Sequence, residues 1–178
     1  MFIDSFFNRF VLPEDLKEAV SKCRWRCYPE TKEQLLEEVI GMMIDRETEA
    51  AGQVLKAEIP VTQKIAGIIS SFRPTQEETP IEGALMQPEN VIMHEKIRKK
   101  IVEAAIPLLS GVVEEGIAQG VFSCDCIPER VRMLLVISSA TFDEGRFTAR
   151  DVAVFIDMTE KLLGAEPGTM GFIRDLIR

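Results

Sequence analysis

The sequence has few of the residues on which enzymes and metal sites depend. Its 178 residues include one histidine, one tryptophan and one tyrosine, and aromatic residues make up only 7% of the chain. A single histidine leaves little capacity for general acid–base chemistry at neutral pH. The chain also lacks a glycine-rich phosphate loop, a G-x-S-x-G nucleophile turn and an H-E-x-x-H metal motif. We therefore expect a protein that is not an enzyme and that needs no cofactor and no metal ion.

Long apolar runs are missing as well. No segment approaches the roughly 20 apolar residues of a membrane span. The first ten residues contain Asp4 and Arg9 and do not resemble a secretory signal. We expect a cytoplasmic protein with no membrane partner. The 46% of hydrophobic residues still suffices for a packed core, and the net charge of -8 disfavours general nucleic-acid affinity without excluding a local basic contact.

Cysteine is scarce, with four residues in two close pairs: Cys23 with Cys27, and Cys124 with Cys126. In a cytoplasmic protein the expected state is a reduced thiol. The second pair is too close in sequence for ordinary zinc-knuckle spacing, so a zinc site would require the two pairs to meet in space. Redox sensing by these thiols is an open alternative.

Strand signals are absent, and the chain is predicted to be all-α. There is no sustained apolar–polar alternation and no Asn-Gly or Asp-Gly hairpin turn. Thr31 and Gln34 form a capping box at the start of a long helix. Pro107 is expected to kink or divide its helix near residue 103. The predicted helices span 31–56, 60–74, 79–86, 88–120, 128–142 and 149–163, the last ending at Gly164, and a short helix follows Pro167.

The two helices at 128–142 and 149–163 are apolar over more than one face, as in "RVRMLLVISSATF". Such helices must be buried on more than one side. A second copy of the chain could supply that side through a four-helix interface, and the alternative is a central position in a monomer. The predicted dimer-interface residues are Val131, Leu134, Leu135, Ser138, Val152, Phe155, Ile156, Thr159 and Leu163.

A small basic patch stands out near the amino terminus. The stretch "AVSKCRWRCYPETKEQLL", residues 19–36, places Lys22, Arg24 and Arg26 around the only Trp and the only Tyr of an acidic chain. Basic side chains ordered by an aromatic anchor indicate a local contact with nucleic-acid phosphates.

Several motifs give the chain a resemblance to a known family. Val20, Ser21 and Lys22, then Tyr28, then the run Thr31–Leu36 follow the pattern of a recognition helix and the start of a connecting helix. "FIDSFFNRF" near the start, "EEGIAQGVF" at 114–122 and "FIDMTEKLLG" at 155–164 fit further segments. Together they resemble the tetracycline-repressor (TetR) family of bacterial transcription regulators.

The resemblance implies a helix-turn-helix head at 1–30 and a ligand-binding and dimerisation body at 31–178, with 31–56 as the connecting helix. It implies a homodimer that binds operator DNA and releases it when a ligand changes the spacing of the two heads. We expect such a ligand-responsive regulator to be a repressor. The candidate DNA-binding residues are Ser21, Lys22, Arg24, Arg26, Tyr28 and Lys32.

The head departs from the family pattern. Between Phe10 and Val20 the chain is about ten residues too short for a complete helix-turn-helix. Ala19 and Cys23 replace the usual glycines, and Pro29 replaces an aromatic residue. One interpretation is a short, divergent recognition helix. The other is a degenerate head on a dimeric small-molecule-binding protein that no longer binds DNA; a misassigned gene start or a frameshift upstream of residue 20 would look the same.

The resemblance also places a small apolar or amphipathic ligand inside the body, among the helices at 60–74, 79–86 and 88–120. His94 is either a polar contact to this ligand or an ordinary histidine near a helix start. The candidate ligand-binding residues are Ile65, Ile69, Phe72, Met86, Met93, His94, Ile97, Ile101 and Met133.

Overall fold

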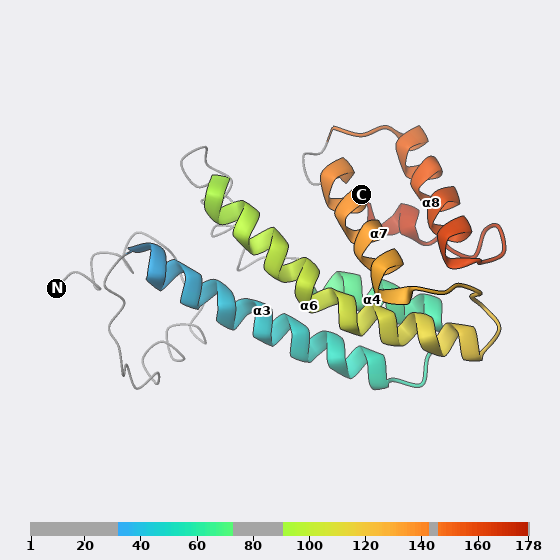
Figure 1. The fold of residues 1–178 in the computed structure, drawn as a ribbon, viewed down its shortest axis with the longest axis horizontal. Helices are drawn as coiled ribbons and strands as arrows, with labels where there is room; N and C mark the ends of the chain where they lie inside the picture. Colours follow the sequence, from blue (N-terminus) through green and yellow to red (C-terminus); the bar gives the residue numbers. More distant parts are fainter. Residues whose placement is uncertain (1–31, 73–90, 143–145, 178) are drawn as a thin grey trace. The chain divides into compact units, whose positions relative to one another are not determined.

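A computed structural model describes residues 32–72, 91–142 and 146–177 (Figure 1). Within these ranges all regular structure is helical and no strand occurs, so the all-α prediction is confirmed for this part of the chain. The predicted head at 1–30 and the predicted helix at 79–86 lie outside the described residues. The helices are α3 (Lys32–Lys56), α4 (Val61–Ser71), α6 (Val91–Ala118), α7 (Ile127–Phe142), α8 (Ala149–Leu163) and α9 (Ile173–Leu176).

The described residues belong to two compact units, and α3 and α6 each contribute to both. The first unit contains the amino-terminal part of α3, residues 32–43, and of α6, residues 91–99. Its described contacts include the buried Ile40 and an ion pair between Lys96 Nζ and Glu37 Oε1 at 2.6 Å. The pair is exposed on both sides, so it contributes little stability.

The second unit, residues 44–72 and 100–177, holds the main apolar core. Helix α8 packs against α7 and α9, and α9 also packs against α4. Ile68 of α4, Val112 of α6 and Leu163 of α8 are almost completely buried in one cluster. The core therefore joins helices from both ends of the described chain, which is what a stable helical body requires.

The prediction is that Pro107 kinks or divides its helix near residue 103. Helix α6 runs unbroken through Pro107, so the division does not occur. Proline removes one backbone hydrogen bond and crowds the preceding turn. Pro107 itself is exposed, while Ala105, Ile106 and Leu109 around it are buried in the core. We infer that packing on both sides of the proline offsets the lost hydrogen bond, because tertiary contacts supply most of a helix's stability in a protein.

The carboxyl end of α6 explains the motif "EEGIAQGVF". Gly120 has φ of 74°, and the N–H groups of Gly120 and Val121 donate to the carbonyls of Ile117 and Gly116 at 3.0 and 2.8 Å. These two bonds make a Schellman stop, in which glycine takes the left-handed position. Phe122 then turns back and is 2% exposed, with its ring against Gly116.

Helix α8 begins and ends as its sequence predicts. Thr148 Oγ1 accepts from the Asp151 N–H at 3.3 Å, and Asp151 Oδ2 accepts from the Thr148 N–H at 2.7 Å, which completes a capping box. The hydrogen bonds to Thr148 hold the pKa of the Asp151 carboxyl below its usual value. Gly164 ends the helix with φ of 62°, and a Cβ at this position would lie 2.1 Å from the Ser123 carbonyl oxygen.

Candidate functional site

The predicted DNA-binding residues cannot be placed in the described part of the molecule. Ser21, Lys22, Arg24, Arg26 and Tyr28 lie outside it. Lys32 is the first residue of α3, and its side chain is also outside what the structure describes. The geometry that bears on function is therefore that of the helical body.

The residues predicted for a dimer interface lie largely inside the single chain. Val131, Val152, Phe155, Ile156, Thr159 and Leu163 are each at most 9% exposed. Leu134 and Leu135 are partly buried against the same core, and Ser138 is half-buried. Apolar periodicity identifies a buried face without saying which surface buries it. Here the inward faces of α7 and α8 form the core of one chain.

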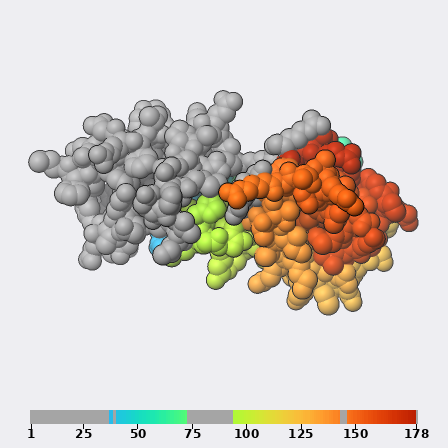
Figure 2. All heavy atoms as spheres, turned by 90° about the horizontal axis from the view of Figure 1, so that it is seen from above, coloured from blue at the N-terminus to red at the C-terminus, as the bar shows by residue number. Residues whose placement is uncertain are grey.

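A different set of apolar side chains on the same two helices points outward. On α7, Met133, Val136 and Ile137 are 57%, 44% and 39% exposed, and Ala140 continues this face one turn further. On α8, Val154 is 60% exposed and Ala153 beside it is exposed as well. We call these six residues the outer face. Figure 2 shows the orange and red segments that contain α7 and α8 at the surface of the molecule.

The apolar periodicity of α7 and α8 predicted the buried face of each helix. It did not predict the outer face, whose residues lie at other positions around the same helices. A sequence signal for it was nevertheless present, because residues 133–142 of α7 include no charged side chain. A helix with apolar side chains on more than one face cannot bury all of them in one core. Large apolar side chains gathered on a surface commonly mark a site of protein association.

The predicted ligand-binding residues fall into both units. Ile65 is buried in the core of the second unit, with Ile69 and Phe72 packed against that core. His94 and Ile97 belong to the first unit, Ile101 to the second, and all three are half-buried. Met133 lies on the outer face, 57% exposed, and not in the interior. Met86, and the side chain of Met93, are outside the described residues.

Two buried polar side chains in the second unit were not predicted. Glu47 continues the buried stripe of α3, which includes Ile44 and Ala51, and is 9% exposed. Burial raises the pKa of the Glu47 carboxyl to about 7, although the charge of Arg46 opposes the shift. Ser110 of α6 is 7% exposed, and its hydroxyl has no hydrogen-bond partner. In the sequence, Glu47 already falls in register with the apolar residues Ile44 and Ala51. A search for apolar residues alone overlooks it, because its side chain is polar.

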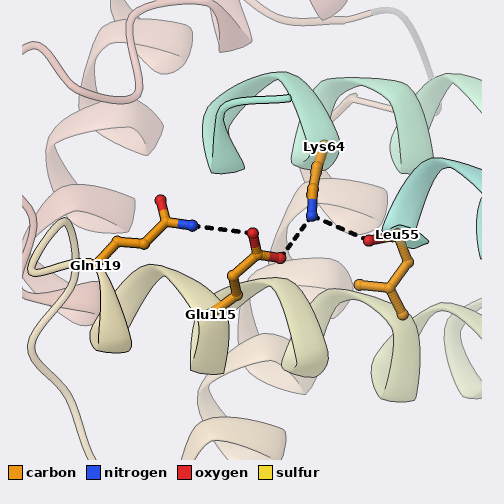
Figure 3. A network of polar contacts seen from close by, with 4 residues as sticks. All are labelled: Leu55, Lys64, Glu115 and Gln119. Atoms are coloured by element: carbon orange, nitrogen blue, oxygen red, sulfur yellow. Dashed lines mark hydrogen bonds and ion pairs between the residues drawn. The ribbon is translucent and has the colours of Figure 1, made fainter. Parts of the chain in front are cut away.

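A third buried polar group joins three segments of the second unit (Figure 3). Lys64 is 5% exposed, and its ammonium donates to the Leu55 carbonyl at 3.0 Å and to Glu115 Oε2 at 2.6 Å. Gln119 Nε2 donates to the other oxygen of Glu115 at 2.9 Å. Lys64 therefore fastens the last turn of α3 to α4 and α6, and it satisfies a carbonyl that the end of α3 leaves open.

No group of three or more His, Cys, Asp or Glu side chains in the described ranges is placed to hold a metal ion. None of the described helices is both long and apolar enough to cross a membrane.

Comparison with known proteins gives no family to which the chain can be assigned. No protein-family model matches the sequence, and no curated protein matches it either.

Proposed function

We propose that the chain is a ligand-responsive transcription regulator of TetR type, which dimerises through the outer face of α7 and α8 and contacts DNA through residues 21–32. The observation that carries the proposal is the exposure of Met133, Val136, Ile137 and Val154 on two helices that pack against each other. Added to this is the basic patch around Trp25 in the sequence.

The exposure of four large apolar side chains to water favours association of the chain with a second copy of itself. Full burial of a fully exposed large apolar side chain contributes about 1.5–3 kcal/mol, and these four side chains, which are 39–60% exposed, can gain roughly half of that each. In a two-fold dimer every such side chain is buried twice, once on each copy. Four large side chains per chain therefore provide a substantial driving force for association, even after the entropic cost of bringing two copies together.

The charges on α8 suit an antiparallel pairing of this helix with its own copy. Arg150 lies three residues before Ala153, and Asp157 lies three residues after Val154. If the pairing is centred between Ala153 and Val154, Arg150 of each copy lies opposite Asp157 of the other. Asp157 also accepts from Lys161 at 2.7 Å, but that pair is exposed and therefore weak, so the carboxylate remains available to a second cation.

The dimer is tested by sedimentation of the purified full chain. The double variant Ile137→Asp with Val154→Asp is expected to be monomeric while its helical content is unchanged, because both side chains are exposed in the single chain. The matched control is Ile59→Asp, since Ile59 is also an exposed large apolar residue, 37% accessible, but lies outside α7 and α8. A wild-type chain that sediments as a monomer would overturn the proposed dimer.

DNA contact is tested by a gel shift with the region immediately upstream of the coding sequence, over a series of salt concentrations. The double variant Arg24→Ala with Arg26→Ala is expected to lose affinity and to show a shallower salt dependence, since each phosphate contact removed reduces the slope by about one. Lys56→Ala with Lys100→Ala removes the same charge from the described body and serves as the control. A wild-type dimer without DNA affinity would indicate a small-molecule-binding protein with a degenerate head.

A further inference from the structure

Helix α8 ends with two backbone carbonyls whose hydrogen-bond donors come from another segment of the chain. The Ser123 N–H donates to the Leu163 carbonyl at 2.9 Å, and Arg130 Nη1 donates to the Leu162 carbonyl at 2.6 Å. The final carbonyls of a helix have no partner within the helix itself. The segment 123–130, which runs from the loop after α6 into the first turn of α7, therefore supplies part of the cap of α8.

The Arg130 side chain is itself held firmly. Its Nε donates to the Asp125 carbonyl at 2.7 Å, and its Nη2 donates to Asp125 Oδ1 at 2.5 Å. The Arg130 N–H donates to the Cys126 carbonyl at 3.1 Å. The guanidinium is planar and its donors point in fixed directions, so contacts to Asp125 and Leu162 together define its orientation. Arg130 thus joins the loop, the first turn of α7 and the last turn of α8.

The other end of the same helix pair is held by aromatic rings. Phe142, the last residue of α7, has its ring centroid 5.1 Å from that of Phe147 and 5.2 Å from that of Phe155, both edge to face. Phe147 comes just before α8, and Phe155 lies within it. Between these two ends α7 and α8 pack side by side (Figure 1). The pair is therefore fixed by a polar contact at one end and an aromatic contact at the other.

This arrangement bears on the outer face, because that face takes residues from both helices. Ile137 belongs to α7 and Val154 to α8, so their separation depends on the spacing of the two helices. A surface whose parts are already fixed loses less conformational freedom on association than one whose parts move. Arg130 is not one of the six residues of the outer face, and its donors are directed to Asp125 and the end of α8.

We propose that Arg130 is the positioning residue of the dimer. By joining the start of α7 to the end of α8, it fixes the spacing of the two helices that carry the outer face and so controls how tightly two copies associate. This inference rests on the dimer proposed above and adds to it the residue that controls its strength.

The inference is tested by sedimentation equilibrium of the full chain, with circular dichroism to confirm that each variant is folded. Arg130→Ala is expected to weaken the dimer about 10-fold or more, because the helix pair must be ordered again on each copy. Arg174→Ala removes the same charge from an exposed position of α9 and should leave the dimer unchanged. A wild-type monomer would overturn the dimer itself. A wild-type dimer that Arg130→Ala does not weaken would overturn only the positioning role.

The variant Arg130→Lys separates positioning from charge. Lysine keeps the positive charge but lacks the planar fork, so it cannot hold Asp125 and the Leu162 carbonyl in the same geometry. It is expected to recover only part of the affinity that alanine loses. Full recovery would mean that the charge alone matters and would overturn the positioning role.

The spacing of the helices is measured directly in the monomeric variant Ile137→Asp with Val154→Asp, so that the result does not depend on association. Spin labels are attached to cysteines introduced at Glu129 and Lys161, which are exposed near the two joined helix ends, after the native cysteines are replaced by serine. A narrow distribution of label distances is expected with Arg130 and a broader one in the Arg130→Ala variant. Equal distributions would show that Arg130 does not fix the spacing.

Discussion

The ammonium of Lys64 lies 2.6 Å from Glu115 Oε2, with the lysine side chain 6% exposed and the glutamate side chain 33% exposed. Residues 64 and 115 are distant in sequence, and their contact joins α4 to α6 at the point where Lys64 also holds the end of α3. A buried cation is tolerated only when its charge and its donors are satisfied. This contact therefore fixes the end of α3 against α4 and α6.

Replacing Lys64 by alanine is expected to destabilise the fold by roughly 1–3 kcal/mol, because it leaves the Leu55 carbonyl and the Glu115 carboxylate without their partner. The partial exposure of Glu115 keeps the loss below that of a fully buried pair. Urea denaturation measures the change. The matched control is Lys96→Ala, which breaks the exposed pair with Glu37 and should cost less than about 1 kcal/mol. Equal losses in the two variants would contradict a structural role for Lys64.

Gly116→Ala is expected to destabilise the second unit by roughly 1–3 kcal/mol, as overpacking does. A Cβ at this position would lie 2.2 Å from the ring of Phe122, which is itself buried. Gly52→Ala, at an open position inside α3, should instead stabilise the protein by roughly 0.5–1 kcal/mol. Thermal unfolding of both variants, together with Gly116→Ala in a Phe122→Leu background, measures the coupling of the two residues. A loss unchanged in that background would exclude the ring as its cause.

Glu47 is expected to make stability depend on pH. Its pKa of about 7 in the fold exceeds the ordinary value of 4.5, so the folded protein binds this proton more tightly than the unfolded chain. The resulting stabilisation is fully present below about pH 4.5 and is lost as the pH rises through 7.

Glu47→Gln should remove this dependence. At pH 8 the variant is expected to exceed wild type by on the order of 1–3 kcal/mol, and at pH 4 the two should be nearly equal. Denaturation at both pH values measures the difference. Glu49→Gln, at an exposed position of the same helix, is the control for the change in net charge. A gain that is the same at pH 4 and pH 8 would contradict the assignment to Glu47.

Thr148→Ala is expected to cost about 1 kcal/mol, because the first turn of α8 loses its side-chain cap. Thr148→Ser keeps the hydroxyl and should recover most of that loss. Both values come from chemical denaturation. If serine and alanine were equally destabilising, the methyl group of Thr148 rather than its hydroxyl would matter for the stability of α8.

The sequence by itself determined that the described part of the chain is helical, and it determined both ends of α8. Capping at Thr148 and the glycine stops at Gly120 and Gly164 are local events, governed by hydrogen bonds within a few residues and by the freedom of glycine at positive φ. Apolar periodicity is equally local, and it placed Val152, Phe155 and Ile156 correctly on one face of α8.

Only the tertiary structure decided what each face meets. The inner faces of α7 and α8 are covered by their own chain, which leaves Met133 and Val154 exposed, and α6 remains one helix at Pro107 because its neighbours pack around it. The partners of Lys64, the Leu55 carbonyl and Glu115, likewise depend on contacts between segments distant along the chain. The physical reason is that burial depends on packing between residues distant along the chain, whereas capping and periodicity depend on near neighbours in sequence.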